Sequence, residues 1–215
     1  MIRRKWIREL AYGSFCDAGG LWGIVNENIS DAVDAKSRTL LDKFPLTDPL
    51  WGQMRQKLAG IEYEELSANI CDVKRKWDVV SCGGVIYHYP KPEELLTMLK
   101  NMANKYLIIT TTFTKPVVSN SKGKIEIAEA LHMPDIDEAT REVVKEDWKE
   151  FLGNKPASGL VYVDDWNKNV YEHWWWLFTE TYLDSLFKKI NLDIVQKAIE
   201  GKTISYLLRC RKFLL

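Results

Sequence analysis

The stretch SFCDAGGLWG, from Ser14 to Gly23, combines an acidic side chain with a run of glycines. An apolar segment ends at Asp17, and Gly19, Gly20 and Gly23 follow it closely. Glycine lets the backbone take positive φ angles and lets a ligand approach it without meeting a side chain. Between a strand and a helix, such a loop predicts a ligand-binding turn. A simple tight turn is the alternative.

A second acid, Asp42, ends the apolar stretch RTLLD. Its carboxylate could accept hydrogen bonds from both hydroxyl groups of a ribose, unless it is a surface or helix-capping residue. The glycine loop lacks the pattern G-x-G-x-x-G that holds a pyrophosphate at a helix N-terminus. The carboxylate of Asp17 would repel a phosphate and attract an ammonium or sulfonium group. These residues favour a cationic nucleoside ligand without phosphate.

Two histidines are the candidates for acid–base catalysis. His173 precedes the three tryptophans 174–176 and is our candidate general base, with a structural role as the alternative. His88 follows the apolar stretch WDVVSC, where pocket lining is the favoured role. Asp164 and Asp165 are further candidates, with a solvated turn as their alternative. Neither these acids nor the four cysteines have a recognised metal-ligand spacing, so we expect no metal site.

Apolar runs and helical spacing alternate along the chain and predict the elements that position these residues. The expected strands are SFCDA, RTLLD, WDVVSC and KYLIITTTF, with a weaker one in EYEELSANI. The expected helices occupy residues 23–36, 48–60, 91–102 and 181–190, and the first would place Ile24, Val25, Ile29, Ala32 and Val33 on one face. This alternation predicts a parallel sheet covered by helices on both faces.

The C-terminal part of the chain departs from this rhythm. The stretches LDIVQKA and TISYLLRCRK predict two strands around a short turn, so the sheet should be mixed and end in an antiparallel hairpin. Between residues 114 and 173 the alternation lapses into a helix, DEATREVVKEDWKEFL, and a segment crowded with aromatic residues. We expect residues 1–215 to form one domain, in which residues 114–173 are an insertion or lid over the carboxyl, substrate-side edge of the sheet.

The composition is that of a globular protein. The 215 residues are 46% hydrophobic and 28% charged, and 30 Lys and Arg balance 30 Asp and Glu. No net field attracts the chain to nucleic acid or membrane, and we interpret the basic clusters RRK at residues 3–5 and RCRK at residues 209–212 as solvated ends of elements. No signal-like or membrane-spanning run is present, and three of the four cysteines lie in or beside strand-like runs, where a reduced, buried thiol is expected. These features predict a cytoplasmic location.

Three segments resemble the class I S-adenosylmethionine-dependent methyltransferases. They are FCDAGGLWG, WDVVSCGGVIYHYPKPEELL and the hairpin that follows WWWLFTETYLDSLF. The second is the most specific, and the resemblance covers nearly everything except residues 114–173. It implies a Rossmann-like α/β fold: a three-layer sandwich with a mixed seven-stranded sheet that ends in an antiparallel hairpin.

The resemblance also implies roles for individual residues. Asp17, Gly19 and Gly20 would hold the methionine moiety of S-adenosylmethionine, and Asp42 would hold the ribose. The amide oxygen of Asn69 would accept from the adenine amino group while Ile70 offers its backbone N–H, with Asp72 as the fallback acid. The backbone carbonyls of Cys82 and Gly83 would face the ammonium group. The family has glycine where this chain has Leu21, which predicts a wider path for the loop.

The function these features favour is methyl transfer from S-adenosylmethionine to a small-molecule acceptor, at oxygen, with S-adenosylhomocysteine as the product. The sulfonium supplies an electrophilic methyl group, so the protein must align the acceptor, exclude water and provide a base. The alternatives are an RNA or protein methyltransferase, an NAD-dependent oxidoreductase and a non-catalytic cofactor-binding module.

Overall fold

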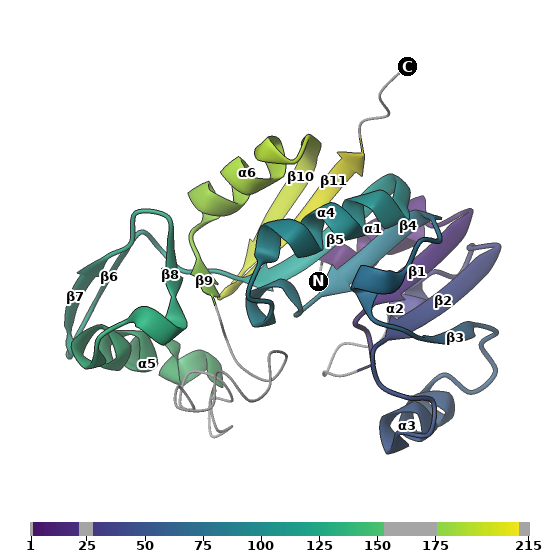
Figure 1. Cartoon of the computed structure of the whole chain (residues 1–215), viewed down its shortest axis with the longest axis horizontal. Coiled ribbons are helices and arrows are strands. Elements are labelled where there is room, and N and C mark those ends of the chain that lie inside the picture. Colours follow the sequence, from purple (N-terminus) through teal and green to yellow (C-terminus); the bar gives the residue numbers. More distant parts are fainter. Residues whose placement is uncertain (1, 22–27, 153–175, 211–215) are drawn as a thin grey trace.

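One seven-stranded sheet organises the fold, in the strand order β10-β11-β5-β4-β1-β2-β3 (Figure 1). The structure is a computed structural model that describes residues 2–21, 28–152 and 176–210. The strands of this sheet are β1 (Ser14–Ala18), β2 (Ser37–Asp42), β3 (Glu64–Ser67), β4 (Trp77–Gly83), β5 (Ala103–Thr112), β10 (Leu192–Glu200) and β11 (Thr203–Cys210). Strands β1 to β5 pair in parallel, and β11 is antiparallel to both β5 and β10. The predicted mixed sheet with its terminal hairpin is confirmed.

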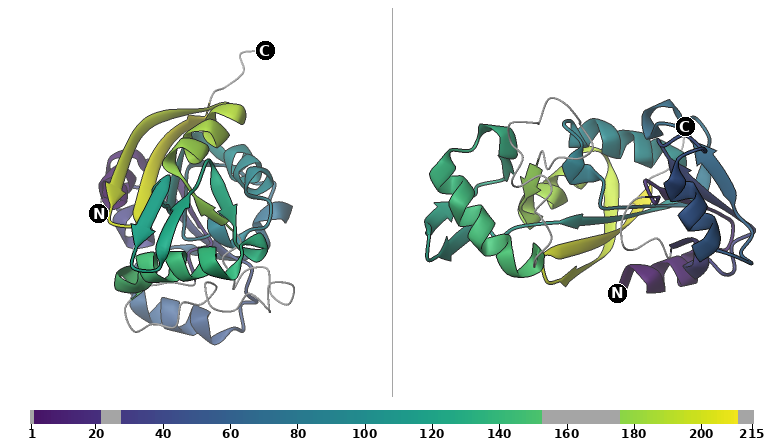
Figure 2. Two further views of the ribbon diagram at one scale, coloured as in Figure 1. Left: turned by 90° about the vertical axis from the view of Figure 1, so that its left-hand side faces the viewer. Right: turned by 90° about the horizontal axis from the view of Figure 1, so that it is seen from below.

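Helices cover both faces of the sheet and complete three layers. Helices α1 (Ile2–Leu10), α2 (Asn28–Asp31) and α3 (Pro49–Lys57) contribute to the hydrophobic cluster on one face. Helices α4 (Pro92–Met102) and α6 (Glu180–Lys189) contribute to the cluster on the other face. The right-hand view of Figure 2 shows α1 and α4 on opposite sides of the sheet. Among the described helices, none has the length and apolar character needed to cross a membrane.

The apolar pattern of the sequence explains these layers. Successive side chains of a strand point to opposite faces, so a strand buried on both faces must be apolar throughout. Strand β5 fits this rule over residues 107–109, which are apolar and buried, and it ends in three buried threonines at residues 110–112. Helix α4 begins with Pro92, which suits a first helical position, and buries Leu95, Leu96, Leu99 and Met102 along one stripe.

The helix predicted for residues 23–36 is shorter than expected. Within the described part of the chain it is α2 alone, since Ile24 and Val25 lie outside that part. Ile29 and Ala32 are buried as predicted, but Val33 is 58% exposed. The side chain of Arg38 donates 2.7 Å hydrogen bonds to the carbonyl oxygens of Ala32 and Val33. Arg38 thus binds carbonyl oxygens that would accept backbone N–H bonds if the helix continued, and the chain leaves the helix after α2.

The chain after β5 forms a separate group of small elements. Strands β6 (Val117–Asn120) and β7 (Gly123–Glu126) make a hairpin, and β8 (Ala130–His132) pairs with β9 (Trp176–Phe178). Helix α5 (Glu138–Leu152), which the sequence predicts, packs with β6 and β7 at one end of the molecule (Figure 1). The short 3-10 helices are η1 (Ile70–Asp72), η2 (Ile86–His88) and η3 (Met133–Asp135). The four small strands are not predicted by the sequence.

Candidate functional site

Polar residues follow the apolar residues at the carboxyl ends of four neighbouring strands. The hydrophobic cluster on the sheet face covered by α1 is called the α1-side cluster. Each of these strands contributes one apolar residue to it, and a polar residue two positions later lies on the same face. The pairs are Phe15 and Asp17, Leu40 and Asp42, Val79 and Ser81, and Ile108 and Thr110; Gly83 and Thr112 continue the last two rows. This places a polar surface at the edge of the sheet where open α/β folds bind ligands.

Two glycines shape the loop after β1. Gly19 has a φ angle of +73°, and a Cβ atom there would lie 2.5 Å from Cγ2 of Val85 in the loop after β4. A Cβ atom on Gly20 would lie 2.3 Å from Oδ2 of Asp17 and 2.8 Å from Cδ1 of Leu40. A side chain at either position would therefore displace its neighbours. The remaining glycine of the motif, Gly23, lies outside the described residues.

Asp17 is almost completely buried, with 1% of its surface exposed. Its Oδ1 accepts a 2.8 Å hydrogen bond from the side-chain amide of Asn28. Its Oδ2 has no hydrogen-bond partner among the described residues. Burial raises the pKa of Asp17 to about 6, although the Asn28 bond and the positive charge of Arg3 oppose this rise. A buried carboxylate of this kind gains most from a cationic ligand.

Asp42 lies on the same face at the end of β2. Its Oδ2 accepts from the backbone N–H of Leu21 at 3.0 Å, and its Oδ1 accepts from that of Lys43 at 2.7 Å. Burial raises the pKa of Asp42, and these backbone bonds oppose the rise. Each carboxylate oxygen can accept more than one hydrogen bond, so both keep capacity for hydroxyl groups. Asp42 thus also holds the glycine loop in place.

Leu21 serves the core. It is 3% exposed and packs in the α1-side cluster with residues such as Leu40 and Trp51. Its side chain is therefore accounted for by packing, in a position where the resemblance leads us to expect glycine.

The segment after β3 presents the residues expected near an adenine. Asn69 caps η1, because its Oδ1 accepts a 3.1 Å hydrogen bond from the backbone N–H of Cys71. Ile70 is the first residue of η1. The assignments of Asn69 and Ile70 to the adenine therefore stay predictions.

Cys82 and Gly83 end β4 on opposite faces. The Cys82 side chain is 1% exposed and packs in the cluster beneath α4, where burial raises the pKa of its thiol. Its side chain is thus occupied by packing, and the role of its backbone carbonyl stays a prediction. A Cβ atom on Gly83 would lie 2.6 Å from Nη1 of Arg3, so the missing side chain makes room for that guanidinium.

Arg3 is a buried charged residue next to this edge of the sheet that the sequence does not predict. Its basic cluster is interpreted from the sequence as solvated, but Arg3 is only 3% exposed. Arg3, Trp6 and Ile7 are the buried residues of α1 and lie on one helical face. This i, i+3, i+4 spacing is the signal that could have identified a buried arginine. Burial lowers the pKa of Arg3, against the effect of the negative charges of Asp17, Asp31 and Glu200.

Several buried polar atoms around this edge have no hydrogen-bond partner within the described ranges. They are Nε and Nη2 of Arg3, Oδ2 of Asp17, Oδ1 of Asn28, Oγ of Ser81 and Oγ1 of Thr112. Asp17 and Ser81 are direct neighbours in the β1–β4 register. Each unpartnered buried group costs about 1–3 kcal/mol, so a cluster of them indicates a polar ligand with donors, acceptors and charge.

The catalytic candidates are only partly described. His88 lies in η2, and its ring is tilted against that of Tyr87 with a centroid separation of 4.2 Å. His173, Asp164 and Asp165 lie outside the described residues. In the part of the chain that the structure describes, no group of three or more His, Cys, Asp and Glu side chains could hold a metal ion.

Contacts of His132 and Trp176 connect the small strands to the loop after β4. Nδ1 of His132 lies 2.6 Å from Oδ2 of Asp135, and its ring packs against Trp176 with centroids 4.6 Å apart. The indole N–H of Trp176 donates to the carbonyl oxygen of Pro90 at 3.0 Å. Trp176 also packs against the hydrophobic cluster beneath α4.

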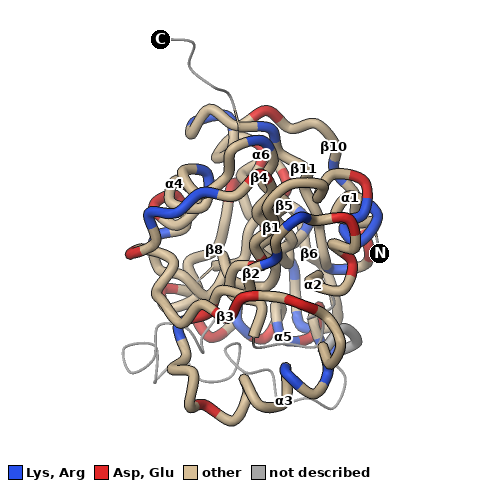
Figure 3. Tube along the Cα trace, turned by 90° about the vertical axis from the view of Figure 1, so that its right-hand side faces the viewer, with Lys and Arg blue, Asp and Glu red and all other residues tan. Residues whose placement is uncertain are grey.

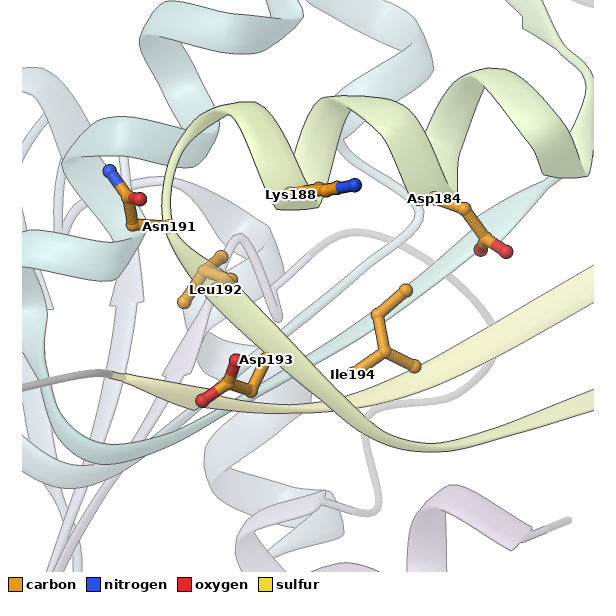
Figure 4. A pocket seen from close by; sticks show the side chains of 6 residues that line it. All are labelled: Asp184, Lys188, Asn191, Leu192, Asp193 and Ile194. Atoms are coloured by element: carbon orange, nitrogen blue, oxygen red, sulfur yellow. The ribbon is translucent and has the colours of Figure 1, made fainter.

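Two concavities lie at the opposite edge of the sheet. One, of about 510 Å³, is lined by Asp184, Lys188, Asn191, Leu192, Asp193 and Ile194, where α6 meets the start of β10 (Figure 4). The other, of about 290 Å³, lies beside η1 and the end of α4. Strand β10 starts at the edge where β5 also starts, so the first concavity is away from the carboxyl ends that carry Asp17 and Asp42.

Comparisons with known proteins identify the fold. No protein-family model and no curated protein matches the sequence. Magnesium protoporphyrin IX methyltransferase from Synechocystis PCC 6803, solved with bound S-adenosylmethionine, is a similar structure: 14% identity over 97% of this chain and 76% of that one, with a TM-score of 0.54. An O-methyltransferase family protein from Burkholderia thailandensis has 12% identity over 99% of this chain and 55% of its own, with a TM-score of 0.61.

A third similar structure is 1,6-didemethyltoxoflavin-N1-methyltransferase, also from Burkholderia thailandensis. It was solved with its substrate and S-adenosylhomocysteine, and it has 12% identity over 93% of this chain and 71% of its own, with a TM-score of 0.54. Identities this low establish a common fold. The chain has the fold of the S-adenosylmethionine-dependent methyltransferases, as its resemblance to class I implies.

Proposed function

We propose that this protein is an S-adenosylmethionine-dependent methyltransferase that acts on a small molecule, at an oxygen atom. The observation that carries the proposal is the buried carboxylate of Asp17, beside a glycine loop and on the same face as Asp42. Both acids lie at the carboxyl ends of neighbouring parallel strands, and the fold is shared with structures solved with this cofactor or its product.

The residues fit the groups of this cofactor. Oδ2 of Asp17 is available for an ammonium group, and the backbone at Gly19 and Gly20 allows a ligand to approach closely. Asp42 would accept from the ribose hydroxyls, while Asn69 and Ile70 would bind the adenine ring. The backbone of Cys82 and Gly83 would complete the wall at β4.

The bound cofactor would supply an electrophilic methyl group on sulfur. The protein's task is then to place the acceptor in line with that methyl group, keep water away and remove a proton from an acceptor hydroxyl. His173 is our proposed base and His88 the second candidate. The segment 114–173, which leaves the carboxyl end of β5, would cover the acceptor as a lid.

Specific observations weigh against the alternatives. Asp17 disfavours an NAD-dependent oxidoreductase, because its carboxylate would repel a pyrophosphate at the glycine loop. The equal numbers of acidic and basic residues disfavour an RNA methyltransferase, and the side shown in Figure 3 carries both signs of charge. The similar structures include both oxygen and nitrogen methyltransferases, so the choice of an oxygen acceptor depends on the histidines alone.

Ligand binding tests the cofactor assignment. S-adenosylhomocysteine should raise the melting temperature in proportion to its occupancy, and NADH should not. Stabilisation by NADH alone would contradict the proposal. Transfer of a labelled methyl group to any acceptor would exclude a non-catalytic binding module.

Substitution of Asp42 tests the ribose site. Asp42→Ala should abolish S-adenosylhomocysteine binding with the fold intact. The wild-type protein should also bind the 2′-deoxy analogue more weakly than S-adenosylhomocysteine itself. Unchanged affinity in both comparisons would remove Asp42 from the site.

Separate substitutions test the two bases. His173→Ala should slow turnover and leave the affinity for S-adenosylhomocysteine unchanged. If His173→Ala keeps full activity and His88→Ala loses it, the base is His88. If neither variant is slower, no histidine acts as the base.

A further inference from the structure

Arg3 belongs to α1, and side-chain hydrogen bonds anchor this helix to the rest of the protein. The indole N–H of Trp6 donates to Oε1 of Gln196 at 2.8 Å. Arg4 and Arg8 both bind the buried carboxylate of Asp31 in α2, each with one bond of 2.6 Å. These contacts fix α1 from two sides, so the buried face that carries Arg3 is held firmly against the sheet.

The guanidinium of Arg3 is directed at the ligand-binding edge. A Cβ atom on Gly83 would lie 2.6 Å from Nη1 of Arg3 and 3.7 Å from Cβ of Thr110. Arg3 therefore lies over the ends of β4 and β5, next to the proposed cofactor site. Its Nε and Nη2 have no hydrogen-bond partner within the described ranges, although both atoms are fully buried.

Arg3 and Asp17 carry opposite charges, and each has side-chain atoms without a hydrogen-bond partner in the described chain. Arg3 and Asp17 influence each other electrostatically, yet Nε and Nη2 of the guanidinium and Oδ2 of the carboxylate have no partner in the described chain. A buried arginine and a buried aspartate in this state form a pair of complementary sites, one for an anion and one for a cation. An α-amino acid group carries an ammonium and a carboxylate on the same carbon atom and would satisfy both residues.

We propose that Arg3 binds the carboxylate of the amino acid end of the cofactor, so that the site selects the intact zwitterionic adenosyl thioether. The proposal rests on the proposed function and names the recognition element for one part of that ligand. Two parallel N–H bonds from a guanidinium match a carboxylate well. Asp17 would bind the ammonium group of the same amino acid.

Three probes divide the ligand into parts. S-adenosylhomocysteine has both charges, its decarboxylated analogue keeps only the ammonium group, and 5′-methylthioadenosine lacks both. Calorimetry on the wild-type protein should give an affinity for S-adenosylhomocysteine about 10- to 150-fold higher than for the decarboxylated analogue, the range expected for a hydrogen-bonded charge. Equal affinities for these two ligands would overturn the proposal without using any variant.

Substitutions then assign this preference to Arg3. In Arg3→Met the affinity for S-adenosylhomocysteine should fall to that for the decarboxylated analogue, whereas the affinity for 5′-methylthioadenosine stays within about twofold, since no bond to it is lost. Arg3→Lys keeps the charge, so its loss should be smaller. The matched control is Lys5→Met, which removes an exposed positive charge from the same helix and should change no affinity.

The outcomes separate the two proposals. If S-adenosylhomocysteine binds equally to wild type, Arg3→Met and Arg3→Lys, the role of Arg3 is refuted and the methyltransferase proposal stands. If the wild-type protein binds none of the three probes, the proposed cofactor itself is refuted. A uniform loss of all three affinities in Arg3→Met would show a structural role and would also overturn the inference.

Discussion

Replacing Asp17 with asparagine should stabilise the ligand-free protein at neutral pH. Burial raises the pKa of Asp17 from 3.8 to about 6. A shift of about two units corresponds to about 3 kcal/mol of difference between the protonated and ionised forms. Asp17→Asn removes the charge and keeps a side-chain oxygen that can accept the bond from Asn28. The variant should therefore gain up to about 3 kcal/mol in its free energy of unfolding at pH 8.

The size of this effect depends on pH. Below about pH 3 the carboxyl group is protonated in both the folded and the unfolded state, and wild type and variant should be similar in stability. As the pH rises towards 6, the unfolded chain ionises readily while the folded chain resists, so the wild-type protein loses stability. The gap between the two proteins should widen between pH 4 and 6 and stay constant above pH 7.

Urea unfolding at pH 4.5, 6 and 8 measures this gap directly. Asp34→Asn is the control, because it makes the same substitution at an exposed acid. The same Asp17→Asn variant should lose S-adenosylhomocysteine binding, which distinguishes a functional acid from a structural one. A variant that is less stable than wild type at pH 8, or a gap that is constant across the three pH values, would refute this reasoning.

Three further predictions concern the same edge of the sheet. The affinity for S-adenosylhomocysteine should fall about tenfold for each pH unit below 6, as Asp17 takes up its proton, and calorimetry across this range would detect a flat profile if the acid is not involved. Gly20→Ala should cost about 1–3 kcal/mol of unfolding free energy through its contact with Asp17, whereas Gly52→Ala, which meets nothing within 4 Å in a helix interior, should be neutral or stabilising by about 0.5–1 kcal/mol; equal effects in denaturant unfolding would contradict this. Asp31→Asn should destabilise the protein by about 2 kcal/mol, because Asp31 accepts charged hydrogen bonds from two arginines, and an unchanged urea midpoint would argue against such an anchor for α1.

The sequence predicts the central sheet well, because most of its strands contain a short apolar run. Strands β4 and β5 and the terminal hairpin were identified from such runs, and the glycine loop was placed correctly after β1. The small strands β6 to β9 could not be predicted in this way. They have three or four residues each and are mostly half-buried or exposed, so their alternation is too short to recognise.

The sequence predicts the candidate site only for residues that follow an apolar run at the end of a strand. Asp17 and Asp42 follow apolar runs at the ends of strands, and this pattern is visible in a single sequence. Arg3 comes from a helix before the glycine loop, and its neighbours Arg4 and Lys5 make it look solvated. Its burial depends on the packing of Trp6 and Ile7 against distant strands, including Leu207 of β11, which local sequence does not reveal.

The attachment of α1 joins segments that are far apart in the chain, and this has a consequence for synthesis. The indole of Trp6 bonds to Gln196 at a separation of 190 residues. On the ribosome, α1 cannot dock fully until the hairpin of β10 and β11 has emerged. The buried setting of Arg3 should therefore form only after β11 has been synthesised, and a nascent chain that lacks this hairpin should leave α1 undocked.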